Sequence, residues 1–234
     1  MEKRELLHKQ SSLRILKYIF NENSPGNGKI FLALLVINIL LSWIFQEFIM
    51  TRDVYHTLLS DKLESYRIDQ QLDIMSRFKI WGYLLLPLVL WLKLTCVSLL
   101  LQMPLLLKFI EVPFRKIFRV VMIASIAVVL MNMVYIIKLY NLPVEGISNN
   151  LLKVQPLSLS SLLDISAYPD SALAILSTFN LFEAGWLFLI FYGFTIIAGK
   201  KLKKTDIALL ISGVWTFLLL LNYALLIYME KAFG

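Results

Sequence analysis

Five long apolar stretches alternate with shorter polar segments along this chain. A helix of about 20 residues crosses the ~30 Å hydrocarbon core of a bilayer, and each stretch reaches that length. The pattern therefore predicts an all-α, polytopic membrane protein with five transmembrane helices. The expected spans cover residues 30–50, 80–103, 118–140, 174–198 and 207–229.

Residues 1–28, before the first span, have a different pattern. Leucines and other apolar residues recur there at near-helical spacing among Lys and Arg, which predicts an amphipathic cytoplasmic segment lying on the membrane surface. Docking onto a partner protein is the alternative interpretation. No repeat or Pro- or Gly-rich linker divides residues 29–234, so we expect a single five-helix transmembrane domain there.

Two longer segments separate the spans on the opposite side. Residues 54–78 carry apolar side chains at helical intervals, which predicts one or two short helices over the end of the bundle. Residues 157–163 are too apolar for a free loop and too few to cross the membrane. A re-entrant segment and a segment packed on the outer face both fit them.

The distribution of Lys and Arg predicts the orientation, because short cytoplasmic loops carry an excess of both. Cations crowd the segments before the first span, between spans two and three, and between spans four and five. The N-terminus is therefore expected in the cytoplasm and the C-terminus outside. The expected inner-face basic patch comprises Arg115, Lys116, Arg119, Lys200, Lys201, Lys203 and Lys204.

Composition agrees with a membrane protein and limits the kinds of functional site to be expected. The chain of 234 residues is 59% hydrophobic and 17% charged, and its mean hydropathy is +0.73. Since membrane topology accounts for most of the net charge of +7, we do not expect a nucleic-acid partner. Two His and one Cys are too few for a standard zinc site, and no phosphate-binding or hydrolase motif occurs. We therefore expect no catalytic, cofactor or metal site.

Two ionisable residues fall well inside expected spans. A charge in the bilayer centre is costly unless it is paired, reaches the interface or faces water. At 1.5 Å per residue, Lys93 lies ~20 Å and Glu183 ~14 Å from the outer ends of their spans. A structural ion pair, a proton or ion relay, and a snorkelling lysine with an interfacial glutamate are the open interpretations of this intramembrane polar pair.

Side-chain amides add polar groups to four of the five spans, at Asn38, Asn132, Asn180 and Asn222. Hydrogen bonding between helices is the expected role, worth about 0.6 kcal/mol for each bond. Asn180 and Glu183 share one helix face. Asn180 also stands near the start of the fourth span, where its side chain can cap a helix.

The sequence around Asn180 resembles a known family. The run from Ser177 to Trp186, followed by Tyr192-Gly193-Phe194 and a basic turn, is similar to the Asn-(Leu/Ile)-Phe-x-x-x-Trp…Gly pattern of bacterial Yip1-family membrane proteins. The segment from Val112 to Val121 resembles the family's Phe-Lys/Arg segment before its third helix. The chain lacks the Asp-Leu-Tyr-Gly-Pro motif of eukaryotic members. The family-like motif residues are Asn180, Leu181, Phe182, Trp186 and Gly193.

The resemblance implies a non-enzymatic scaffold or partner subunit in the cytoplasmic membrane of a bacterium. Its expected partners are the lipid bilayer and either another membrane protein or further copies of the chain. The alternative is a subunit of a membrane transport or export complex, with a polar path through Lys93 and Glu183. A dry bundle with a lateral patch would favour the first function, and a polar path would favour the second.

Overall fold

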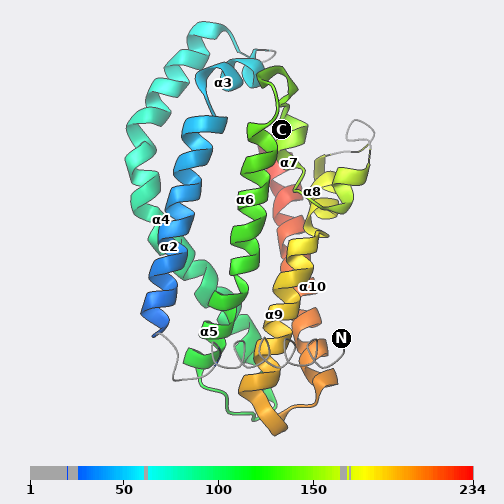
Figure 1. The fold of residues 1–234 in the computed structure, drawn as a ribbon. Coiled ribbons are helices and arrows are strands. Elements are labelled where there is room, and N and C mark those ends of the chain that lie inside the picture. The colour runs from blue at the N-terminus through cyan, green and yellow to red at the C-terminus, as the bar shows by residue number, and fades with distance from the viewer. Residues whose placement is uncertain (1–19, 21–25, 61–62, 164–167, 169, 234) are drawn as a thin grey trace, which may run out of the picture.

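The computed structural model describes residues 20, 26–60, 63–163, 168 and 170–233. Within these residues all regular elements are helices, arranged as an elongated bundle (Figure 1). The longer ones are α2 (Asn27–Ile44), α4 (Ser65–Leu107), α5 (Phe114–Ala124), α6 (Ile126–Tyr140), α9 (Leu181–Ala198) and α10 (Lys204–Phe233). Shorter helices, α3 (Arg52–Leu59), α7 (Asn149–Lys153) and α8 (Asp170–Thr178), lie in the connections.

The five expected spans are confirmed as helices long and apolar enough to cross a membrane. They are Asn27–Ile49, Ser65–Leu107, Phe114–Tyr140, Leu181–Ala198 and Lys204–Tyr228. The first includes the wider helical turn Phe45–Ile49, which continues α2. The chain is therefore a helical-bundle membrane protein.

Two helix starts differ most from the expected ones, and the third span contains a bend. α4 starts at Ser65 rather than near residue 80, because the polar residues before the second span continue the same helix. The third span bends at Ser125, whose hydroxyl donates a 2.8 Å hydrogen bond to the Val121 carbonyl. Such back-bonding by a helical serine often bends a helix. The fourth span starts at Leu181 rather than residue 174, since residues 174–178 belong to α8.

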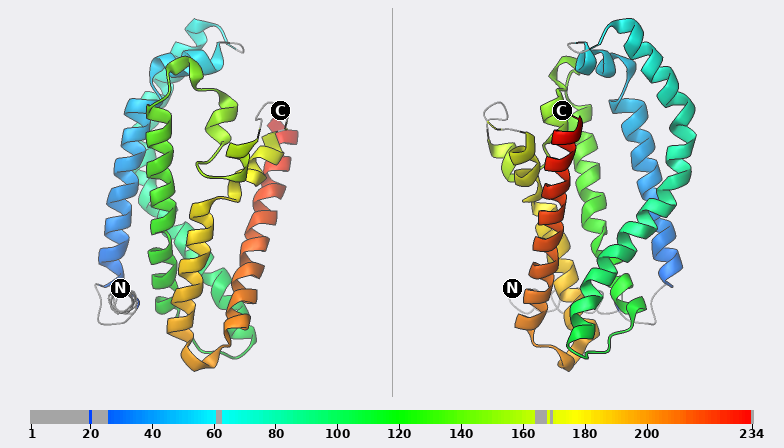
Figure 2. Two further views of the ribbon diagram at one scale, coloured as in Figure 1. Left: turned by 45° about the vertical axis from the view of Figure 1, so that its right-hand side comes forward. Right: turned by 180° about the vertical axis from the view of Figure 1, so that it is seen from behind.

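The two described cation-rich connections, between α4 and α5 and between α9 and α10, lie at one end of the bundle together with the start of α2, the lower end in Figure 1. There Asn27 donates to the Arg115 carbonyl at 3.1 Å, and the Lys201 ammonium donates to the Glu111 carbonyl at 3.1 Å. We call this the basic end. α3 and the turn Val144–Gly146 lie at the opposite end, together with the end of α10 (Figures 1 and 2).

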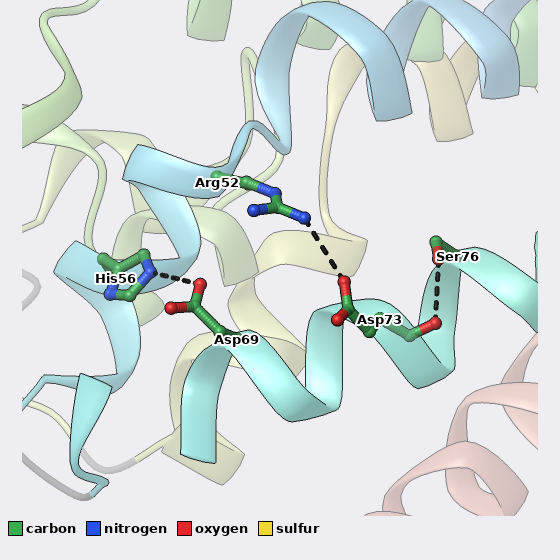
Figure 3. A network of polar contacts seen from close by, with 5 residues as sticks. All are labelled: Arg52, His56, Asp69, Asp73 and Ser76. Carbon is green, nitrogen blue, oxygen red and sulfur yellow. Dashed lines mark hydrogen bonds and ion pairs between the residues drawn. The ribbon is translucent and has the colours of Figure 1, made fainter. Parts of the chain in front are cut away.

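The opposite end is held by exposed polar contacts between α3 and the start of α4 (Figure 3). Arg52 forms an ion pair with Asp73 at 3.3 Å, and the His56 ring lies 3.1 Å from the Asp69 carboxylate. Lys79 pairs with Glu47 further along α4. The polar face of the α4 extension thus contacts α3 and the end of the first span. The sequence predicted one or two short helices in this region, which in the structure consists of α3 and the start of α4.

The apolar core is centred on α5, which packs against α4 and α9. Ile117, Val120, Val121 and Met122 of α5 have no exposed surface. Phe20 packs into the same core and lies edge-on to Tyr192, with ring centroids 6.2 Å apart. The remainder of the predicted amphipathic segment before residue 26 lies outside the described residues.

Candidate functional site

The chain is extended between α8 and α9, and this break is the centre of a buried polar network. The Asn180 side chain accepts a 2.7 Å hydrogen bond from the Glu183 backbone N–H and so caps α9, one of the roles that the sequence allowed for it. The Asn180 amide donates to the Gln155 side chain at 2.8 Å and to the Ser177 carbonyl at 3.0 Å. Asn180 is therefore fixed by three segments of the chain.

Residues 157–159 pair with this break through their backbone. Leu159 N–H donates to the Phe179 carbonyl at 3.0 Å, and Leu181 N–H donates to the Leu157 carbonyl at 3.2 Å. These bonds satisfy polar groups that the break in the helix would leave free, a requirement that is strict within a membrane. The apolar segment 157–163 is thus attached to the start of α9, which agrees with both interpretations of that segment.

Three buried serines extend the network. The Ser158 and Ser160 hydroxyls lie 2.7 Å apart, and the Ser160 and Ser177 hydroxyls also lie 2.7 Å apart. Ser177 donates onward to the Lys153 carbonyl at 3.0 Å. Because every hydroxyl has a partner, this chain of hydrogen bonds fixes α7, α8 and the segment between them rather than leaving a reactive group.

Glu183 is held on the other side by α10. The Trp215 indole N–H donates to its carboxylate at 3.0 Å. The Trp215 ring also lies edge-on to Phe179, with centroids 5.4 Å apart. Trp215 therefore fixes both the carboxylate in the first turn of α9 and the aromatic residue in the break.

A cavity of about 630 Å³ opens to the surface beside this break, and we call it the lateral cavity. Its wall is mostly apolar, and Leu162 and Leu181 on its rim are strongly exposed. Asn180, Glu183 and Trp215 also line it. The lateral cavity thus combines an apolar surface with a few fixed polar groups, a combination common in binding sites.

Lys93 and Glu183 line a second cavity of about 240 Å³, the central cavity. Asn38, Ser125 and Asn132 also line it, so polar side chains from four of the five spans converge there. No direct ion pair joins Lys93 to Glu183 in the described part of the chain. Whether the two charges pair across the cavity stays a prediction.

A third cavity of about 410 Å³, the α2–α4 cavity, shares Lys93, Asn38 and Asn132 with the central one. Apolar side chains from these two helices make up much of its wall, among them Leu41, Phe45 and Val89. Glu183 in turn lines both the central and the lateral cavity. The three cavities therefore follow one another across the bundle through Lys93 and Glu183.

The family-like motif residues do not form one site. Asn180 and Leu181 belong to the break, while Phe182 and Trp186 are half-buried on α9. Gly193 lies two turns beyond Trp186, where α9 approaches α5. A Cβ atom added there would lie 2.6 Å from a Val120 methyl carbon. Glycine at 193 is therefore required by packing.

The basic patch is only partly a surface feature. Arg115, Lys201, Lys203 and Lys204 are exposed at the basic end, and Lys116 is half-buried. Arg119 is 8% exposed within α5, so it belongs to the packed interior. The Lys200 side chain lies outside the part of the chain that the structure describes.

The sequence did not single out Gln155, Ser158, Ser160 or Trp215 as members of the polar network. Their signal was weak, because serines in a loop and a tryptophan within a span are common. Among the described residues, no three His, Cys, Asp or Glu side chains lie close enough together to hold a metal ion. Comparison with protein families, with curated proteins and with solved structures gave no match to this chain.

Proposed function

We propose that this protein is a non-enzymatic membrane scaffold, a partner subunit that binds a transmembrane helix of another membrane protein in the lateral cavity. The observation that carries the proposal is the concave, mainly apolar surface beside the α8–α9 break. Helices associate within a membrane through close packing and interhelical hydrogen bonds. A fixed concave surface offers a helix more packing contacts than mobile lipid chains can make.

The polar network supports this function by making the surface rigid. Asn180 and Trp215 fix the start of α9, and the serines fix the segment that forms the opposite rim. A preformed site binds more tightly because less conformational entropy is lost on association. The resemblance to bacterial Yip1-family proteins points to the same class of function.

The orientation proposed here places the basic end in the cytoplasm and the C-terminus outside, in a bacterial cytoplasmic membrane. Exposed cations at Arg115, Lys201, Lys203 and Lys204 support it through the positive-inside rule. Assembly with a further copy of this chain is the alternative to a different membrane protein as partner.

Site-directed crosslinking in membranes tests the partner-subunit function. In a Cys96→Ala background, Leu181→Cys places a thiol on the cavity rim, and Leu84→Cys places one on α4. These leucines are 66% and 65% exposed, so the two positions are matched for access. We expect a defined protein adduct from position 181 and little from position 84. Equal crosslinking from both positions, or none from position 181, would contradict the proposal.

Transport is the second candidate function, and the succession of cavities through Lys93 and Glu183 favours it. Under this alternative the chain is a subunit of a transport or export complex. Its test is water access to the centre of the bundle. Ser125→Cys should react with a small membrane-impermeant thiol reagent in a Cys96→Ala background, whereas a closed, dry interior would leave it unreactive.

A further inference from the structure

The central and α2–α4 cavities together have an order of chemical groups that suggests a ligand. The α2–α4 cavity supplies an apolar wall, Lys93 lies where the two cavities join, and Glu183 lies on the central cavity. From the α2–α4 cavity to the central cavity, the lining is first apolar, then cationic at Lys93 and then anionic at Glu183.

Lys93 has no hydrogen bond or ion pair within the described part of the chain. A lysine in the middle of a span is costly to insert into a bilayer, so a compensating group is expected. Glu183 compensates it only at a distance, because the Trp215 N–H holds that carboxylate on the α10 side. An anion at Lys93 would supply the missing contact.

Charge balance restricts the nature of that ligand. A simple anion would leave an excess negative charge beside Glu183, which is unfavourable in surroundings of low dielectric. A ligand with one anionic and one cationic group would pair with both side chains and leave the site neutral. The side chains of Asn38 and Asn132 line both cavities and can supply hydrogen bonds at the junction.

We propose that these two cavities bind a phospholipid with a zwitterionic head that ends in a primary amine, of the phosphoethanolamine type. In such a lipid the acyl chain, the phosphate and the amine follow one another in the order of the surfaces. The chain lies in the α2–α4 cavity against Leu41, Phe45 and Val89. The phosphate binds Lys93 and the ammonium binds Glu183.

These two cavities are distinct from the lateral cavity, although Glu183 also lines the latter, and the inference requires neither a partner helix nor transport. A fatty acid does not fit as well, because it has no group for Glu183. A free zwitterion leaves the apolar cavity unused. A lipid with a zwitterionic head accounts for the lining of both cavities.

The test is a binding titration of the delipidated full-length protein in mild detergent, followed by native mass spectrometry. Four probes are compared: lysophosphatidylethanolamine, lysophosphatidylglycerol and monoacylglycerol with one common acyl chain, and phosphoethanolamine without a chain. One charge-assisted hydrogen bond corresponds to about tenfold in affinity or more. We therefore expect the ethanolamine lysolipid to bind about tenfold more tightly than the glycerol lysolipid, with the other two probes weaker still.

Variants test which side chain binds the phosphate and which binds the ammonium of the lipid head group. Glu183→Gln should remove the preference for ethanolamine over glycerol, and Lys93→Met should weaken binding of both phospholipids about tenfold. Lys138→Met and Glu111→Gln, which change a lysine and a glutamate that do not line the two cavities, should leave all affinities unchanged. If a variant is not recovered folded, the ranking of the four probes on the unaltered protein still decides.

Three results would overturn the inference. Equal binding of the two phospholipids would remove the role of Glu183, and monoacylglycerol binding as tightly as they do would remove that of Lys93. Phosphoethanolamine binding as tightly as its lysolipid would show that the α2–α4 cavity holds no acyl chain. Failure of the partner-subunit function would leave these measurements unaffected, since they use the isolated protein.

Discussion

The indole N–H of Trp215 donates a 3.0 Å hydrogen bond to the carboxylate of Glu183, joining the middle of α10 to the first turn of α9. Glu183 is half-buried and lines two cavities. The bond therefore fixes a charged group that would otherwise be free to turn toward either cavity. Its removal should affect both stability and binding.

Trp215→Phe should destabilise the protein by about 1–3 kcal/mol, because a half-buried carboxylate loses its donor while an aromatic ring remains beside Phe179. Unfolding by SDS in mixed micelles measures this change. Trp81→Phe is the matched control, since Trp81 is 60% exposed on α4. Equal effects of the two substitutions would show that the hydrogen bond is not the cause.

Gly193→Ala should destabilise the protein by about 1–3 kcal/mol despite alanine's higher helix propensity, because its Cβ atom would overlap Val120 and Phe20. Gly213→Ala is the control within α10, where nothing lies within 4 Å of the added atom. There we expect no loss, or a gain of up to about 1 kcal/mol. The same SDS unfolding assay compares the two variants, and a neutral result at 193 would contradict the close approach of α9 to α5.

Asn180→Ala should cost about 1–3 kcal/mol, because it removes the cap of α9 and leaves the Gln155 side chain without its donor. Asn180→Asp keeps an acceptor for the cap but loses the donor, so an intermediate effect is expected. Asn141→Ala serves as the control, since the exposed Asn141 side chain at the C-terminal end of α6 makes a local bond, donating to the Ile137 carbonyl four residues before it. Thermal unfolding in detergent measures the stability of each variant. We expect Asn180→Ala to be the least stable, Asn180→Asp to be intermediate and the unaltered protein to be the most stable. Any other order would argue against this network.

The proposed orientation is tested by reporter fusions. A reporter following Gly234 should behave as extracytoplasmic, and one inserted between Lys201 and Lys203 should behave as cytoplasmic. Alkaline phosphatase, active only outside, and green fluorescent protein, fluorescent inside, provide opposite readouts. A cytoplasmic C-terminus would mean that the alternation proposed here is wrong.

The sequence could predict much of the fold because bilayer thickness imposes a length on every apolar helix. All five spans were found from runs of about 20 apolar residues, and the cap formed by Asn180 followed from its place near a helix start. The boundary at residue 174 was wrong because residues 174–178 are as apolar as the span that follows. Hydropathy does not distinguish a short helix beside the span from the span itself.

The sequence by itself determined the all-helical membrane class, the five spans and the presence of Lys93 and Glu183 within them. Only the tertiary structure decided what these charges face. Their positions on α4 and α9 place both on one cavity, and Trp215, 32 residues beyond Glu183, binds the carboxylate. Such contacts depend on the rotation and tilt of packed helices, which an almost uniformly apolar sequence specifies weakly because every face is compatible with lipid.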